Sequence, residues 1–205
     1  KDFTIYDSDD AQRLIKSVMA EMEVSEKNFA PKALLSEISF AKNRMITSAE
    51  MKENAGADFR KKTIARVYSH YCARLKESNA LDFDDILLLT VKIFEDFPEA
   101  LDKFRNRYKY ILVDEYQDTN QVQFRLVSLL SEQHRNICVV GDDDQSIYKF
   151  RGADITNILS FEKQFEGAVV IRLEQNYRST KTILNAANAV IAHNEERKEK
   201  ALWTN

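Results

Sequence analysis

The first indication of the fold is a short apolar run that stops at two adjacent carboxylates. The run is Tyr110–Val113, and Asp114 and Glu115 follow it directly. Four apolar residues between polar segments predict a buried strand with both acids at its carboxyl end. In an open α/β sheet ligands bind at that edge, and two carboxylates there suit Mg²⁺ binding and water activation in nucleoside-triphosphate hydrolysis. The alternative is a strand that ends in an ordinary polar turn, because Asp-Glu pairs are common.

The residues downstream predict a β-α-β unit. Apolar residues recur at helical spacing from 122 to 130, and a second apolar run, Ile137–Val140, ends at a loop that contains Gln145. A right-handed crossover would make the two strands parallel and would bring Gln145 near the two acids. Cys138, inside the second run, is expected to be a small buried thiol. A third strand is expected at Val169–Leu173, before a helix with Ser179 as its N-cap.

Upstream of the first apolar run, the hydrophobic period predicts helices. Apolar residues recur at helical spacing in four segments, and a short helix is expected after a proline: 14–22, 34–45, 59–75, 86–93 and the residues after Pro98. Asp9 or Asp10 would cap the first helix, and Asp82 or Asp84 would cap the fourth. The chain up to about residue 80 is therefore expected to be all-helical.

Three longer motifs resemble the UvrD/PcrA/Rep family of superfamily 1A DNA helicases. They are Val113–Asn120 (VDEYQDTN), Val140–Asp154 (VGDDDQSIYKFRGAD) and Leu173–Thr180 (LEQNYRST), in the order and spacing of the family. A weaker likeness at Leu81–Asp85 extends the resemblance over essentially the whole chain. Three long motifs in register arise by chance far less often than one short pattern.

The resemblance implies an α/β fold with two parts. One is a partial RecA-like P-loop NTPase lobe, a parallel sheet with flanking helices, and the other is an all-helical inserted subdomain. We expect the helical insert in residues 1–80, the second half of the first RecA-like lobe in 81–167, and the start of the second lobe in 168–205.

By the same resemblance, ATP and Mg²⁺ are the cofactors. Asp114 would ligate Mg²⁺, Glu115 would activate the attacking water, and Gln145 would sense the γ-phosphate. Tyr177 would stack on the adenine, and Arg178 would be the arginine finger, a role worth about 10³ to 10⁵ in rate. The alternative for Arg178 is an ordinary surface cation near a helix start.

The implied single-stranded DNA track contains Tyr148, Phe150 and Arg151. Aromatic faces bind bases without reading sequence, at about 1 to 3 kcal/mol per base. The family commonly has tryptophan where this chain has Phe150, which keeps a stacking face of smaller area. The i, i+2 spacing of the two aromatic residues equally fits one face of a short strand packed into the core. We expect the three consecutive acids at 142–144 to form a solvated loop and not a metal cluster, because three consecutive side chains are not expected to face one ion together.

A phosphate-binding P-loop pattern is absent from the sequence. The only glycines are Gly56, Gly141, Gly152 and Gly167, and none fits Gly-x-x-x-x-Gly-Lys. We therefore expect an internal fragment of a longer helicase, and we expect the isolated chain to hydrolyse no ATP.

The charge composition indicates how strongly this chain can bind DNA. The net charge is −3, so this chain alone is expected to bind DNA weakly. Basic residues from Arg60 to Arg74 form either a basic helical face or a solvated charge stripe. No apolar run approaches the roughly 18 residues of a membrane span.

Family resemblance implies a cytoplasmic, nucleoid-associated bacterial enzyme. Such an enzyme would move 3′ to 5′ on single-stranded DNA and unwind duplex junctions, and repair proteins are further candidate partners. Two alternatives are a non-hydrolysing DNA- or partner-binding module and the motor part of a helicase-nuclease.

Overall fold

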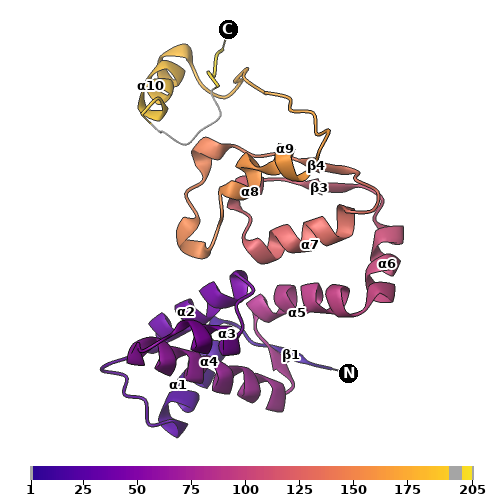
Figure 1. Ribbon diagram of the computed structural model, residues 1–205. Coiled ribbons are helices and arrows are strands. Elements are labelled where there is room, and N and C mark those ends of the chain that lie inside the picture. Colours follow the sequence, from indigo (N-terminus) through magenta and orange to yellow (C-terminus); the bar gives the residue numbers. More distant parts are fainter. Residues whose placement is uncertain (1, 194–199, 205) are drawn as a thin grey trace. The chain divides into compact units, whose positions relative to one another are not determined.

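The computed structural model describes residues 2–193 and 200–204 (Figure 1). The fold is mixed α/β, with short parallel sheets and many helices. Its elements, in chain order, are β1 (Thr4–Ile5), α1 (Ser8–Glu21), α2 (Pro31–Asn43), α3 (Ser48–Asn54), α4 (Phe59–Glu77), β2 (Ala80–Leu81), α5 (Phe83–Asp96), α6 (Pro98–Arg107), β3 (Ile111–Val113), the 3-10 turn η1 (Tyr116–Asp118), α7 (Gln121–Ser131), β4 (Ile137–Val139), the 3-10 turns η2 (Asp143–Gln145) and η3 (Lys149–Arg151), α8 (Thr156–Leu159), α9 (Phe161–Gln164) and α10 (Lys181–Ile191).

The chain forms two compact units. Unit 1 comprises residues 1–109 and 120–134, and unit 2 comprises residues 110–119 and 135–205. The division expected from the sequence, at residues 80 and 167, follows the family resemblance and stays a prediction.

Unit 1 is mainly helical and contains two apolar clusters. In the first cluster α1, α2 and α4 lie side by side (Figure 1) and bury apolar side chains such as Ile15 and Tyr71. The second cluster joins α5, α6 and α7 through residues such as Val91 and Leu129. The four long helices expected in this unit are present, whereas α3 was not predicted. β1 and β2 pair in parallel, and β2 contacts α4 and α5.

Side chains of the first turns fix where these helices begin. Asp7 caps α1, because its carboxylate accepts the N–H groups of Asp9 and Asp10 at 2.8 and 2.9 Å. The expected caps Asp9 and Asp10 were therefore wrong, because both lie inside the first turn. Asp82, one of the two expected caps of α5, is confirmed: it accepts the N–H of Asp85 at 2.9 Å. Such a capping interaction stabilises a helix by about 1 kcal/mol.

Unit 2 is built around β3 and β4. The two strands are adjacent and parallel, as expected, with Val113 opposite Val139. The expectations of a buried first strand and of a buried thiol at Cys138 were wrong: Leu112 is 77% exposed, and Cys138 is exposed too. Among the described residues this sheet has only two strands, so part of its apolar surface has no covering layer.

The third strand expected at Val169–Leu173 was also wrong. This segment is extended and exposed, and it forms no ladder with any described residue; the only bridge nearby pairs Gln175 with Trp203. An apolar, β-branched run becomes a strand only where a neighbouring strand pairs with its N–H and C=O groups. The helix that follows, α10, has Thr180 as its N-cap, one residue later than the expected Ser179.

Candidate active site

The loops after β3 and β4 meet at one edge of the sheet. The N–H of Val140 donates to the carbonyl of Val113 at 2.8 Å, and the N–H of Tyr116 donates to the carbonyl of Val140 at 2.9 Å. These bonds hold the first residues of both loops together past the ends of the strands. The carboxyl edge of a parallel sheet is the usual place for a ligand in α/β proteins.

Asp114 and Glu115 occupy a tight turn at this edge. Glu115 has left-handed backbone angles, φ 50° and ψ 41°, which are uncommon for a residue with a side chain. The Asp114 carboxylate accepts the N–H of Glu115 at 2.9 Å. Both acids are exposed, and no Lys or Arg of the described residues forms an ion pair with them. The turn therefore presents two uncompensated carboxylates to solvent.

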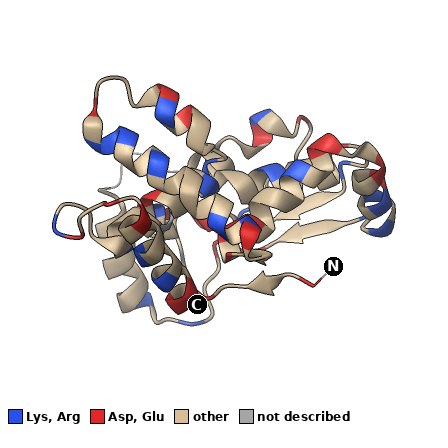
Figure 2. Cartoon of the chain, turned by 90° about the horizontal axis from the view of Figure 1, so that it is seen from below, with Lys and Arg blue, Asp and Glu red and all other residues tan. Residues whose placement is uncertain are grey.

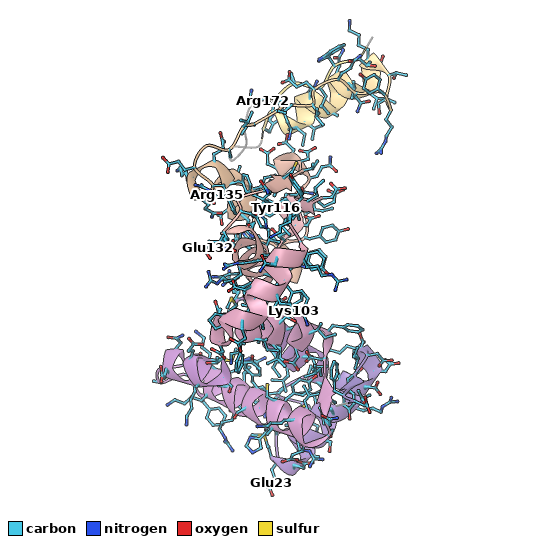
Figure 3. The ribbon with its side chains drawn as sticks, turned by 90° about the vertical axis from the view of Figure 1, so that its right-hand side faces the viewer. Glu23, Lys103, Tyr116, Glu132, Arg135 and Arg172 are labelled. Atoms are coloured by element: carbon cyan, nitrogen blue, oxygen red, sulfur yellow. The ribbon has the colours of Figure 1, made fainter. Side chains whose placement is uncertain are left out.

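The turn η1 is anchored below these acids by an aromatic residue. Tyr116 is fully buried and packs edge-to-face on Phe161, with ring centroids 5.6 Å apart (Figure 3 labels Tyr116). Burial raises the pKa of its phenol to about 12. Its packing fixes the backbone from which Glu115 and Gln117 project.

Hydrogen bonds connect Glu115 to the loop after β4. Gln117 donates to Glu115 at 2.8 Å and accepts the N–H of Asp142 at 3.0 Å. Asp142 in turn accepts the side-chain amide of Gln145 at 2.6 Å. Glu115 and Gln145 are thus linked through two intermediate residues. We did not single out Gln117 from the sequence; its position in the Val113–Asn120 motif, two residues after Glu115, was the available signal.

The acids 142–144 are not the solvated loop that we expected. The carboxylates of Asp143 and Asp144 are only 8% exposed, and oxygens of all three acids lie within 4.8 Å of one another. All three pair with one cation, Lys200, which lies 2.7 Å from Asp143 and 3.3 Å from Asp144 and contacts Asp142 more closely. Asp142 directly precedes η2, whose first two residues are Asp143 and Asp144, and its carboxylate accepts the N–H of Asp144 at 3.0 Å. This compact turn keeps the three carboxylates close together, which an extended loop would not do.

The pKa of Asp142 reflects this pairing. Burial raises the pKa, but hydrogen bonds from Lys200 and Gln145 outweigh burial and hold the pKa below its ordinary value. For Lys200, burial lowers the pKa, and the carboxylates of Asp142 and Asp143 outweigh that effect and raise it. Both groups are therefore charged over the neutral range.

The proposed DNA-track residues lie in and beside η3. Tyr148 and Phe150 are 38% and 76% exposed, with ring centroids 5.9 Å apart. The alternative of a short strand packed into the core was wrong, because the backbone here forms a 3-10 turn and exposes both rings. The side chain of Arg151 lies outside the described residues.

Tyr177 and Arg178 belong to a turn before α10. Tyr177 is 85% exposed and donates its hydroxyl to Gln175 at 2.7 Å, while the backbone N–H of Arg178 donates to Asn176 at 2.9 Å. Among the described contacts, none joins the exposed Arg178 to Glu115 or Gln145. The structure therefore brings Asp114, Glu115 and Gln145 into one region and does not bring Tyr177 and Arg178 into contact with them.

The donor set at the β3 turn fits a hard divalent cation. Asp114 and Glu115 offer exposed carboxylate oxygens, which are the ligands that Mg²⁺ prefers, and Mg²⁺ commonly binds through one or two carboxylates plus phosphates and water. The acids 142–144, by contrast, are already paired with Lys200.

Figure 2 shows Lys and Arg interspersed with Asp and Glu along the helices. Basic residues of α4 such as Lys61 and Arg66 are exposed, as both sequence interpretations allow.

Comparison with known proteins identifies the family. A family profile described as the UvrD/REP helicase N-terminal domain matches residues 1–166. The chain belongs to the UvrD/Rep helicase family. A second profile, the UvrD-like helicase C-terminal domain, matches residues 171–205.

Individual UvrD/Rep relatives agree with this assignment. The chain is 51% identical over 204 residues to the ATP-dependent DNA helicase PcrA of Staphylococcus aureus, and 50% identical over 204 residues to the protein of that name from Staphylococcus epidermidis. Each alignment covers the whole chain and 28% of the relative.

In residues 2–193 and 200–204, no helix has both the length and the apolar character of a membrane-spanning segment.

Proposed function

We propose that the β3–β4 edge is the ATP-hydrolysing site of a DNA helicase that moves 3′ to 5′ on single-stranded DNA. The observation that carries this proposal is the run of hydrogen bonds from Glu115 through Gln117 and Asp142 to Gln145. A motor that couples hydrolysis to movement needs the water-activating group and a phosphate-sensing group to respond together. The high identity to ATP-dependent DNA helicases supports the same activity.

Each residue then has a role in the full-length protein. Asp114 holds Mg²⁺, which when bound neutralises charge on the phosphates, and Glu115 orients and deprotonates the attacking water. Gln145 faces the γ-phosphate, Tyr177 stacks on the adenine, and Arg178 stabilises charge on the transferring phosphoryl group once the motor closes.

The exposed rings of Tyr148 and Phe150 suit a single-stranded DNA track, with Arg151 beside them. Exposed aromatic faces stack on any base, which a translocating motor requires because it must not stop at particular sequences. Duplex junctions and DNA-repair proteins are the partners that this role would bring.

In this proposal β3 and β4 belong to a RecA-like lobe, and the phosphate cradle comes from other residues of the full-length protein. The present sequence contains no Gly-x-x-x-x-Gly-Lys pattern. The 205-residue chain alone should consequently hydrolyse no ATP.

The test is the Glu115→Gln variant of the full-length protein. Steady-state ATP turnover with single-stranded DNA should fall about 10²-fold to 10⁴-fold, the range expected when a general base is removed. The amide is nearly isosteric with the carboxylate, so the thermal unfolding midpoint should stay unchanged. The matched control is Glu99→Gln, because Glu99 is an exposed acid in the first turn of α6.

Two results would contradict the proposal. One is a wild-type protein with no DNA-stimulated ATP turnover. The other is a Glu115→Gln variant that retains the turnover of Glu99→Gln.

A further inference from the structure

Gln117 is a buried polar residue that links Glu115 to the loop after β4, and the roles assigned above include none for Gln117 itself. Its side chain is 1% exposed, although it lies between two exposed or partly exposed acids, Glu115 and Asp118. Burying an amide costs free energy unless its donors and acceptor are all used. Its contacts therefore indicate what this residue does.

The amide of Gln117 is used at both ends. Its Oε1 accepts the backbone N–H of Asp142 at 3.0 Å. Its Nε2 donates to Glu115 Oε2 at 2.8 Å and lies 3.5 Å from Asp118 Oδ2. A backbone N–H can only donate and an ionised carboxylate can only accept, so these partners fix which end of the amide faces which group.

Gly141 leaves room for this arrangement. A Cβ at residue 141 would lie 2.6 Å from Gln117 Oε1 and 2.7 Å from a methyl of Ile158. Neither distance is compatible with van der Waals contact. A side chain at residue 141 would therefore displace the Gln117 amide from the loop after β4.

The two acids beside Gln117 repel each other. Burial and then the charge of Glu115 raise the pKa of Asp118, while the hydrogen bond from Gln117 opposes the rise. The NH₂ group of Gln117 has two N–H bonds and can face both carboxylates at once. It therefore fixes the direction of the Glu115 carboxylate without adding a charge.

We propose that Gln117 is a positioning residue, which holds the Glu115 carboxylate in the orientation for hydrolysis and ties it to the loop that carries Gln145. This inference rests on the proposed function. Gln117 does not touch the reacting atoms; it acts through Glu115 on one side and through Asp142 on the other. An amide suits this position because it combines a donor for a carboxylate with an acceptor for a backbone N–H.

The first test replaces Gln117 in the full-length protein with side chains that keep its length. Gln117→Met removes donor and acceptor, and Gln117→Glu keeps the acceptor but replaces the donor with a third carboxylate. Both variants should lose about 10-fold to 100-fold in kcat for DNA-stimulated ATP hydrolysis, the usual cost of losing an orienting partner. The KM for ATP should change less than about twofold, because Gln117 does not contact the nucleotide.

The pH dependence separates positioning from mere support of the fold. A carboxyl group at residue 117 lies among other carboxylates in a buried place, so its pKa would be raised. In its protonated form it has an O–H donor and a C=O acceptor, as the amide has. The kcat of Gln117→Glu, relative to wild type at each pH, should therefore recover as the pH is lowered from 8 to about 6, whereas that of Gln117→Met should not.

Gly141→Ala tests the same geometry without altering Gln117, and it should lower kcat in the same direction. The control is Gln121→Met, the same chemical change at an exposed position on α7, which should behave as wild type.

The outcomes distinguish the two proposals. If wild type is active and Glu115→Gln is inactive, but Gln117→Met and Gln117→Glu keep wild-type kcat, the positioning role is wrong and the proposed function stands. Equal losses in both variants at every pH would also overturn it, because a purely structural glutamine gives that result. If wild type has no ATP turnover, the proposed function itself fails.

Discussion

Two acidic motifs in this chain look alike in sequence but differ in the folded protein. Leu81–Asp85 in unit 1 and Val113–Asp118 in unit 2 each place acids directly after a short strand of a parallel pair. In unit 1 the acids are used by the fold. In unit 2 the two acids that follow the strand directly, Asp114 and Glu115, remain exposed at the sheet edge.

A buried lysine makes the difference in unit 1. Lys42 is 1% exposed, and its ammonium lies 2.7 Å from both Asp82 and Asp85, while Tyr71 donates its hydroxyl to Asp82 at 3.1 Å. Burial lowers the pKa of Lys42, but the two carboxylates outweigh burial and raise it. The cluster thus ties α2, α4 and the start of α5 together.

Unit 2 supplies no such cation to Asp114 and Glu115 among its described residues. Its lysine at this edge, Lys200, pairs with the acids 142–144 instead. An acidic motif after a strand is therefore structural where the fold buries a cation against it. It is available to a ligand where the fold does not.

The largest effect on stability is expected when Lys42 is replaced, which tests the structural role of the unit 1 acids. Lys42→Met leaves two partly buried carboxylates without their cation, which should cost about 3 to 5 kcal/mol of stability. The measurement is hydrogen exchange of the α2 and α5 amides in the full-length protein. Lys61→Met, at an exposed position on α4, is the control and should change little. A Lys42→Met protein as protected as Lys61→Met would remove the distinction between the two motifs.

A smaller effect is expected at Asn120, the last residue of the Val113–Asn120 motif. Its substitution tests whether this end of the motif stabilises the fold, in contrast to the exposed acids at the start of the motif. Asn120 caps α7 by accepting the N–H of Gln123 at 2.9 Å, and it donates to the buried Asn43 at 2.6 Å. Asn120→Ala should cost about 1 kcal/mol for the cap and about 1 to 3 kcal/mol for the unpaired oxygen of Asn43. Urea unfolding measures the change. Thr47→Ala, which removes only an exposed cap, should cost about 1 kcal/mol, and equal losses in the two variants would show that the Asn43 contact contributes nothing.

The smallest effect concerns Lys200 and pH. Because the pKa of Asp142 is lowered in the folded state, its contribution to stability is complete above the ordinary Asp value of 3.8 and is lost as the pH falls through the lowered value. Lys200→Met should reduce stability by about 1 kcal/mol at neutral pH through the Asp142 pair, because the two side chains are 20% and 29% exposed and solvent screens their attraction.

The difference between Lys200→Met and wild type should shrink below pH 4, as followed by thermal unfolding. Lys181→Met, at an exposed residue of α10, should show no such dependence. A difference that stays constant down to pH 2 would mean that the Asp142 pair is not its source.

Local signals in the sequence predicted much of the fold. The helical period located the long helices, and Asp82 was recognised as a cap because its carboxylate needs only residues of the next turn. The parallel pairing of β3 and β4 followed from the two apolar runs and the connection between them. Family motifs added the residues of the candidate site, and the structure places Asp114, Glu115 and Gln145 at one edge.

Features that depend on distant partners could not be predicted. The segment Val169–Leu173 has the composition of a strand, yet no described neighbour pairs with it. Lys200 lies more than 50 residues from the acids it binds, so spacing gives no sign of the contact. The role of Gln117 depends on a backbone N–H of another loop, and only coordinates reveal that hydrogen bond.

The most direct test of the account compares ATP turnover per folded molecule in Glu115→Gln and Lys42→Met, both in the full-length protein with single-stranded DNA. The account predicts that Glu115→Gln loses turnover by about 10²-fold or more with an unchanged unfolding midpoint. Lys42→Met should unfold more easily but keep the turnover of wild type in its folded fraction. The reverse pattern, with hydrolysis dependent on Lys42 and indifferent to Glu115, would contradict the account.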